Sequence, residues 1–157
     1  MTGDVVIVTG VTAGREDELR EHLRGLDDTT GPLGGMTAQT HFARFVVLPL
    51  DGFKLFFSSR FDGSRAGYLA ELADRPAAAA IWSFCDPQAA GDPGRLGAYL
   101  EAHAIAAPYV LAAWSEVSVA EVNAAVGRRA RLSGFAVRAA GLDPVGLAHA
   151  FREEFRR

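Results

Sequence analysis

Two runs of aromatic and β-branched residues, His41 to Leu48 and Phe53 to Asp62, flank an Asp51-Gly52 pair. Such residues favour strands, and an Asp-Gly pair between them is typical of a two-residue hairpin loop. The pattern therefore predicts a β-hairpin over residues 41–62, with Asp51-Gly52 as its loop.

A two-residue loop fixes which side chains share a face of the hairpin, because side chains alternate along each strand. One face then carries polar side chains at one end and apolar ones at the other: His41, Asp62, Ala43, Arg60, Phe45, Ser58, Val47 and Phe56. The opposite face is apolar except for Arg44 opposite Ser59: Phe42, Phe61, Val46, Phe57, Leu48 and Leu55. We expect the second face to meet helices and the first to form a half-polar pocket.

The rest of the first hundred residues alternates between strand and helix patterns. A β-rich run over residues 5–11 predicts a strand, and leucines at helical spacing predict a helix over residues 15–26. A helical pattern follows the hairpin and is interrupted at Arg75-Pro76, which predicts a helix in two pieces ending near Phe84. Asp92-Pro93 predicts the start of another helix that reaches His103.

The last third of the chain predicts one strand and two helices. Tyr109 to Trp114 is expected to be the fourth strand. Ser118 with Glu121 forms a capping box, and Asp143-Pro144 repeats the pattern of a cap followed by proline, so each predicts a helix start.

The predicted order is β-α-β-β-α-β followed by helices, which indicates an α+β, ferredoxin-like fold with a four-stranded antiparallel sheet. Pro49 suits this order, because the second strand would lie at a sheet edge. We expect a single domain over residues 1–157, with a core at about 4–116 and a helical extension at about 117–157. The sheet face without helices must be covered by a second copy, giving a dimeric α/β barrel with Phe45, Val47 or Phe56 near the interface, or by the C-terminal helices.

Composition and charge exclude some classes of binding partner. The net charge is −3 and basic residues are scattered, so we expect no nucleic-acid partner. No apolar run is long enough to cross a membrane, there is no secretory signal pattern and there is a single cysteine, so we expect a soluble, cytoplasmic protein.

Neither a cofactor nor a metal is expected. A glycine pattern at residues 10–14 is similar to a dinucleotide-binding turn, but Glu16 stands where its last glycine belongs. His22, His103 and His149 stand alone on predicted helices, without a second ligand at helical spacing.

The segments His41-Phe42-Ala43-Arg44-Phe45, Ser58 to Ser64 and Ile81 to Cys85 resemble a group of bacterial proteins in the dimeric α/β-barrel superfamily. The resemblance covers roughly residues 5–114. The superfamily includes antibiotic-biosynthesis monooxygenases, polyketide cyclases and haem-handling enzymes. The resemblance implies a homodimer with a pocket at the open sheet face, and it does not select one reaction.

The strongest candidate for chemistry is His41 beside Asp62. A carboxylate fixes the tautomer of an imidazole and raises its basicity, so His41 would be a general base and Asp62 its orienting partner. Alternatively, Asp62 caps the helix that starts near Ser64 and His41 is exposed at a strand end. Arg60, helped by Ser58, would stabilise an anion, or it is a surface arginine near the barrel rim.

Large side chains are candidates for contact with an apolar substrate, although core or dimer packing explains them equally well. These candidates are Phe45, Phe56, Ser58, Trp82, Tyr109 and Trp114.

These features lead to a primary hypothesis, a small cofactor-independent enzyme of bacterial and possibly secondary metabolism. It would carry out acid/base cyclisation or oxygenation of an apolar, oxygen-bearing substrate on the open sheet face. The alternatives are a non-catalytic protein that binds an apolar ligand, and a haem-binding protein with His41 as the axial ligand.

Overall fold

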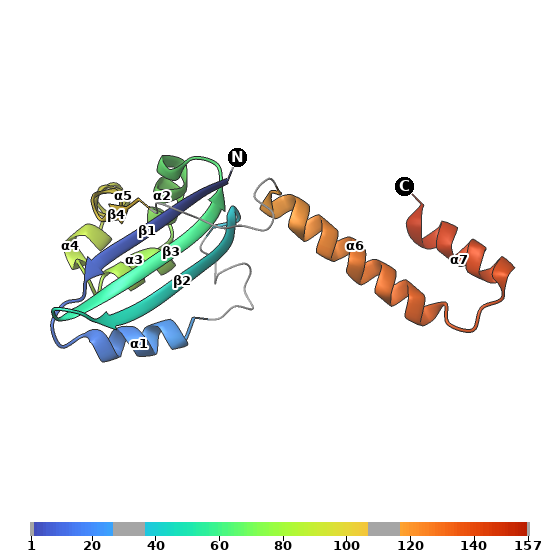
Figure 1. The fold of residues 1–157 in the computed structure, drawn as a ribbon, viewed down its shortest axis with the longest axis horizontal. Helices are drawn as coiled ribbons and strands as arrows, with labels where there is room; N and C mark the ends of the chain where they lie inside the picture. Colours follow the sequence, from blue (N-terminus) through green and yellow to red (C-terminus); the bar gives the residue numbers. More distant parts are fainter. Residues whose placement is uncertain (1, 27–36, 107–116, 157) are drawn as a thin grey trace. The chain divides into compact units, whose positions relative to one another are not determined.

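The computed structural model describes residues 2–26, 37–106 and 117–156. The chain divides into two compact units, Met1–Val119 and Ala120–Arg157 (Figure 1). The second unit begins close to the predicted start of the helical extension. That the whole chain forms a single domain stays a prediction.

The first unit is built on a four-stranded antiparallel sheet with the strand order β2-β3-β1-β4. The strands are β1 (Thr2–Gly10), β2 (Thr40–Pro49), β3 (Phe53–Asp62) and β4 (Ala104–Ile105). The predicted α+β class with a four-stranded antiparallel sheet is confirmed. Because β2 is an edge strand, Pro49 removes no hydrogen bond from the interior of the sheet. The predicted strand over Tyr109–Trp114 lies outside the described residues.

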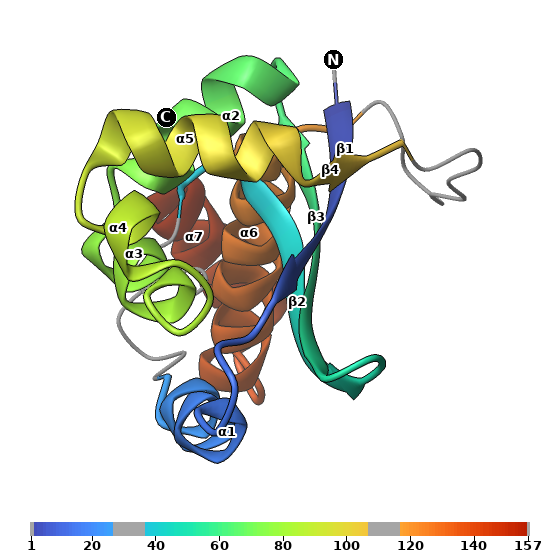
Figure 2. The same ribbon diagram turned by 90° about the vertical axis from the view of Figure 1, so that its left-hand side faces the viewer.

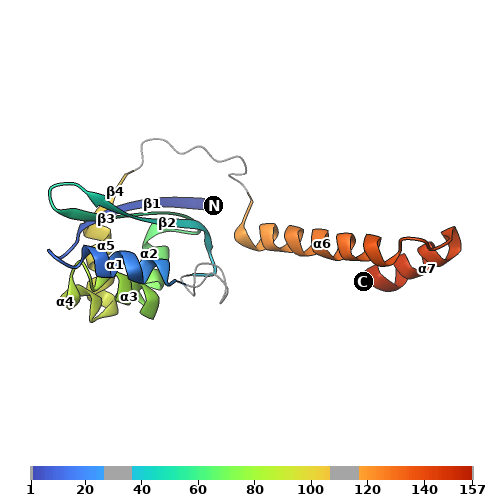
Figure 3. The same ribbon diagram turned by 90° about the horizontal axis from the view of Figure 1, so that it is seen from below.

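The helices of the first unit cover one face of this sheet (Figures 2 and 3). They are α1 (Glu16–Arg24), α2 (Arg65–Ala73), α3 (Pro76–Trp82), α4 (Pro87–Ala90) and α5 (Pro93–Ala102). The predicted break at Pro76 is confirmed, since α2 ends and α3 begins there. The cap at Asp92 is confirmed as well, because its carboxylate accepts a hydrogen bond from the Arg95 N–H at 2.8 Å.

The core lies between the sheet and these helices. Its largest fully buried side chains include Trp82, Tyr68, Phe57 and Phe61. Trp82 meets the rings of Phe45 and Phe57 edge-on, with centroid distances of 5.8 Å and 5.4 Å. Phe45 and Trp82 therefore belong to the helix-facing core and not to the open sheet face, where a substrate was expected to contact them.

The predicted hairpin is present, but its predicted two-residue loop is wrong. Pro49 pairs with Phe53, so Leu50, Asp51 and Gly52 form a three-residue loop. Asp51 and Gly52 adopt positive φ angles of 38° and 79°, which Asp and Gly tolerate better than most residues. One additional loop residue shifts the register of β2 by one position.

This shift reverses the predicted faces of β2, because a shift of one residue turns every side chain to the other side of the sheet. Phe45 and Val47 pack against the helix-side core, whereas they were expected on the open face. Phe42, Arg44, Val46 and Leu48 lie on the open face, whereas they were expected to meet helices. The faces of β3 were predicted correctly, since Leu55, Phe57, Ser59 and Phe61 are buried in alternation.

The second unit consists of two predicted helices, apart from Val119, the first residue of α6, which belongs to the first unit. α6 spans Val119–Arg138 and α7 spans Pro144–Phe155. Phe135, Phe151 and Phe155 contact one another, with centroid distances between 4.7 Å and 5.6 Å. Arg138 of α6 pairs with Glu154 of α7 at 2.7 Å. None of the described helices combines the length and the apolar character needed to cross a lipid bilayer.

The core assignment of Trp82 makes a testable prediction. Trp82→Ala should lower the free energy of unfolding by about 3–5 kcal/mol, the usual cost of truncating a buried aromatic side chain. Urea unfolding followed by circular dichroism measures this. Leu50→Ala is the matched control, because Leu50 is 57% exposed in the hairpin loop and its truncation should cost less than about 0.5 kcal/mol. Equal effects of the two variants would contradict the assignment.

Candidate functional site

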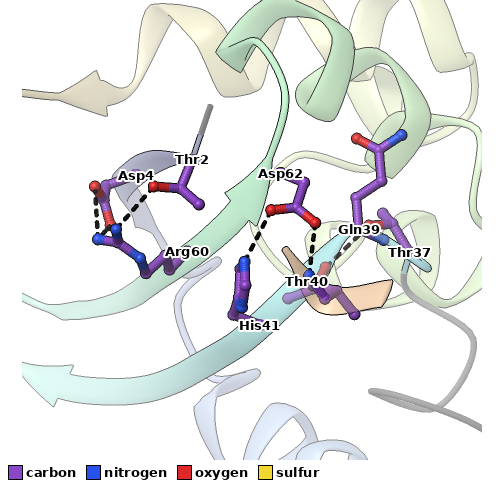
Figure 4. Close-up of polar contacts among 9 residues, drawn as sticks. Thr2, Asp4, Thr37, Gln39, Thr40, His41, Arg60 and Asp62 are labelled. Atoms are coloured by element: carbon purple, nitrogen blue, oxygen red, sulfur yellow. Dashed lines mark hydrogen bonds and ion pairs between the residues drawn. The ribbon is translucent and has the colours of Figure 1, made fainter. Parts of the chain in front are cut away.

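The site lies where β2 begins and β3 ends, on the face of the sheet that the helices of the first unit leave open. There His41 Nε2 lies 2.9 Å from Asp62 Oδ1, and Figure 4 shows the two side chains turned toward each other. Their side chains are 17% and 25% exposed, so both are partly open to solvent. The predicted contact between His41 and Asp62 is confirmed.

The contact depends on an irregularity in β2 that the sequence analysis did not predict. Thr40 pairs with Phe61 and Phe42 pairs with Arg60, so His41 is an extra residue without a partner of its own on β3. Such a β-bulge changes the direction of the side chains around it. The bulge cancels, at this one position, the register shift caused by the longer loop, and His41 therefore reaches the open face despite that shift.

Asp62 holds two hydrogen bonds through its two carboxylate oxygens. Oδ1 faces His41, and Oδ2 accepts a hydrogen bond from the N–H of Val119 at 2.8 Å. Burial by itself raises the pKa of Asp62, but the hydrogen bonds from Val119 and His41 outweigh burial and hold this pKa below its usual value. Asp62 is therefore ionised at neutral pH.

The ionised carboxylate fixes the tautomer of His41. A carboxylate can only accept hydrogen bonds, so the facing nitrogen, Nε2, carries the proton and Nδ1 holds the lone pair. In a neutral imidazole this leaves Nδ1 as the basic atom. The arrangement is therefore able to take up a proton at Nδ1 and to stabilise the resulting imidazolium through Asp62.

The alternative role predicted for Asp62, capping the helix after it, is wrong. The N-cap of α2 is Ser64, whose hydroxyl accepts the hydrogen bond of the Gly67 N–H at 3.2 Å. Because Ser64 satisfies this helix end, both oxygens of Asp62 remain for His41 and Val119.

Arg60 lies on the same face as His41, as predicted, and the protein itself provides its partners. Its guanidinium lies 3.2 Å and 3.4 Å from the two carboxylate oxygens of Asp4, and it donates to the hydroxyl of Thr2 at 2.8 Å (Figure 4). The side chain is 11% exposed. Arg60 thus ties β3 to β1 and leaves a largely compensated positive charge near His41.

The open face also carries apolar side chains. Phe56 lies there as predicted, and Phe42, which the sequence analysis had turned toward the helices, is 47% exposed beside His41. The other apolar members of this open face are Val6, Val8, Val46, Leu48 and Ile105. Ser58 also lies on this face. Tyr109 and Trp114 lie outside the described residues.

The described residues contain no second group of side chains suited to metal binding or nucleophilic catalysis. Among them, no three His, Cys, Asp or Glu side chains are grouped as a metal site would require. Burial raises the pKa of the Cys85 thiol, which accepts a hydrogen bond from Thr9, so this cysteine is poorly suited to act as a nucleophile. A cavity of about 350 Å³ between α2 and α5 contains none of the predicted site residues.

Comparisons of the chain with protein-family models, with curated proteins and with solved structures found no match. The resemblance to the dimeric α/β-barrel superfamily therefore stays a prediction.

The lowered pKa of Asp62 predicts how stability depends on pH. A carboxylate whose pKa is lower in the folded state contributes its full stabilisation above its unfolded pKa of about 3.9, and loses it as the pH falls through the folded value. Asp62→Asn should therefore lower the free energy of unfolding by about 1 kcal/mol near neutral pH, and by less under acidic conditions. Urea unfolding over the acidic and neutral range measures both.

The matched control is Asp51→Asn in the exposed hairpin loop, which should change stability little at any pH. A loss for Asp62→Asn that stays constant from neutral to acidic pH would contradict the role assigned to the carboxylate.

Proposed function

We propose that the chain is a small acid/base enzyme that acts on an apolar, oxygen-bearing substrate at the open sheet face. The observation that carries this proposal is the His41–Asp62 pair, in which Nε2 and Oδ1 lie 2.9 Å apart on the open sheet face, next along the strand to the exposed Phe42. An accessible imidazole oriented by an ionised carboxylate is a base suited to near-neutral pH. The proposal needs neither a metal nor a cofactor.

Each site residue has a distinct part in this proposal. Nδ1 of His41 removes a proton from the substrate, and Asp62 holds the ring and stabilises its charged form. Arg60 adds a fixed positive charge near the anion that forms, reduced by its pairing with Asp4. Phe42, Phe56 and Ser58 would contact the apolar body and the oxygen of the substrate. Such a proton removal can begin a cyclisation, and it can also begin an oxygenation in which molecular oxygen is the oxidant and accepts the electrons of the substrate carbanion, so both reaction types stay open.

We further propose that the first unit has the ferredoxin-like fold and pairs with a second copy through the open sheet face. Two features support this: the strand order β2-β3-β1-β4, which the ferredoxin-like arrangement shares, and the apolar side chains on a sheet face without helices of that unit. The second copy would close the site above His41.

A non-catalytic protein that binds an apolar ligand is the second candidate. Two contacts favour it: Arg60 pairs with Asp4, and Asp62 accepts a hydrogen bond from the N–H of Val119. Both contacts stabilise the fold, so Arg60 and Asp62 have a structural role that requires no catalysis. A haem ligand role for His41 is less favoured, because Nε2 already faces Asp62.

The proposed base is testable without the natural substrate. The probe 5-nitrobenzisoxazole is apolar and reacts when a base removes its ring C–H proton: the C–H electrons form the nitrile, the N–O bond breaks and a coloured cyanophenolate is released. The protein should accelerate this reaction over free imidazole at equal concentration. His41→Ala should lower the rate by about 100-fold or more while folding is retained, and Asp62→Asn should lower it less.

The control variant is His149→Ala, which removes an exposed histidine from α7 and should leave the rate unchanged. Melting temperatures of all variants should be measured alongside. A rate that His41→Ala does not reduce would contradict the proposed base. Binding of the probe without acceleration would favour the ligand-binding candidate.

The proposed dimer has its own test. Val46→Asp places a carboxylate on the open face opposite Phe56 and should convert a dimer into monomers, because an unpaired charge is costly to bury in an interface of about 1,000 Å². Light scattering at micromolar concentration measures the mass. Leu50→Asp in the hairpin loop is the control and should remain dimeric. A monomeric wild-type protein would overturn the dimer.

A further inference from the structure

We propose that a chain of buried hydroxyl groups beneath β2 holds the bulge at His41, which makes Ser59, Tyr68, Thr40 and Thr37 positioning residues for the base. The inference takes from the proposed function that His41 is the reactive group, and otherwise it depends only on contacts within the first unit.

The chain of hydroxyl groups starts and ends on the segment that contains His41. Ser59 Oγ donates to the carbonyl oxygen of Phe42 at 3.0 Å and lies 2.7 Å from Tyr68 Oη. Thr40 Oγ1 lies 3.4 Å from Tyr68 Oη and 2.9 Å from Thr37 Oγ1. The N–H of Gln39 donates to Thr37 Oγ1 at 3.3 Å. The two ends, Gln39 and Phe42, bracket the bulged residue.

The number of hydroxyl hydrogens determines which group donates and which accepts in each hydrogen bond of this chain of hydroxyl groups. Each hydroxyl has a single hydrogen, and that of Ser59 is used on the Phe42 carbonyl, so the Tyr68 hydroxyl must donate to Ser59. Thr40 then donates to Tyr68, and Thr37 donates to Thr40. Every hydroxyl in the chain has both an acceptor for its hydrogen and a donor to its oxygen.

Because the hydroxyl groups are buried, water cannot easily substitute for the hydrogen bonds between them. Thr37, Thr40, Ser59 and Tyr68 are each 3% exposed or less, so water cannot readily take over a lost hydrogen bond. The ring of Tyr68 is fixed in addition by stacking on Phe61, with centroids 4.0 Å apart and planes 3° from parallel. The hydroxyl of Tyr68 therefore sits on a rigid support, and the last donor, Ser59, is held where the Phe42 carbonyl needs it.

The link to His41 follows from the geometry of a bulge. An extra residue leaves the local hydrogen bonds of the strand pair disrupted. Here Ser59 provides a side-chain donor to the carbonyl next to the bulge, and Thr40, the residue before His41, is anchored into the core on the other side. His41 is thus turned to the open face between two residues held from below.

The test removes single hydroxyls and observes His41 directly. Ser59→Ala removes the donor to Phe42, and Tyr68→Phe removes the middle of the chain while keeping the stacked ring. Nitrogen NMR of the imidazole reports its tautomer, and a carbon titration reports the pKa of Asp62. In the wild type the proton should reside on Nε2 of His41. Both variants should give a mixture of tautomers, an Asp62 pKa closer to about 3.9 and a rate with the benzisoxazole probe that is lower by about 10-fold or more.

The matched control is Thr9→Val, which removes another buried hydroxyl from the helix-facing side of the sheet, on β1. It should leave the His41 tautomer and the Asp62 pKa unchanged, even if the melting temperature falls. The inference is overturned if Ser59→Ala and Tyr68→Phe lower the melting temperature but keep a single His41 tautomer and the wild-type Asp62 pKa. If the tautomer changes but the wild-type protein does not accelerate the probe reaction, the positioning role stands and the proposed base fails.

Discussion

The extra residue that β2 carries at His41 is the constraint on which the site depends. Between the hairpin loop and this bulge, β2 packs Phe45 and Val47 against the helix-side core and leaves Val46 and Leu48 on the open face. A regular strand in the same register would send His41 toward the helices, where an imidazole would need a buried partner. The bulge lets one strand supply large apolar side chains to the core and a polar side chain to the other face.

Two charged pairs on the open face join neighbouring strands. Asp4 of β1 holds Arg60 of β3, and Asp62 of β3 holds His41 of β2. A charge that already has a partner costs less to remove from water than an isolated one. The two pairs therefore lower the cost of covering this end of the open face, and they keep an ionised carboxylate next to the imidazole at the same time.

The sequence predicted elements better than it predicted register, and the hairpin shows why. Some helix starts are marked by local chemistry, such as Asp92 before Pro93, and that prediction is confirmed. The register of β2 has no such marker, because Phe45 and Val47 on one side and Val46 and Leu48 on the other are equally apolar. Either face satisfies the hydrophobic pattern. An Asp-Gly pair is compatible with loops of two or three residues, so the loop did not decide between them.

Because the sequence did not specify the register of β2, it predicted some site residues correctly and others wrongly. His41 and Asp62 were predicted as partners from a register that is wrong along most of β2, and their contact exists because the bulge compensates for the shift. Phe45 and Trp82 were chosen for their size, which suits a pocket wall and a core equally, and only the packing of α3 against the sheet assigns them to the core. The donor that holds the bulge, Ser59, has no sequence pattern of its own, because its partner is a main-chain carbonyl of the neighbouring strand.

The two oxygens of Asp62 connect these observations to the chemistry of His41. Because Ser64 caps α2, one oxygen is free to accept from His41 while the other accepts from Val119. An asparagine in this place has a single oxygen. If that oxygen keeps the Val119 N–H, the amide NH₂ group faces His41 Nε2 and requires an acceptor there. The tautomer with the imidazole proton on Nδ1 is then favoured, and Nδ1 is a base only in the minor tautomer, which lowers the rate without abolishing it. Asp62 therefore does more than hold the ring in place: as a carboxylate it determines which nitrogen of His41 is able to react.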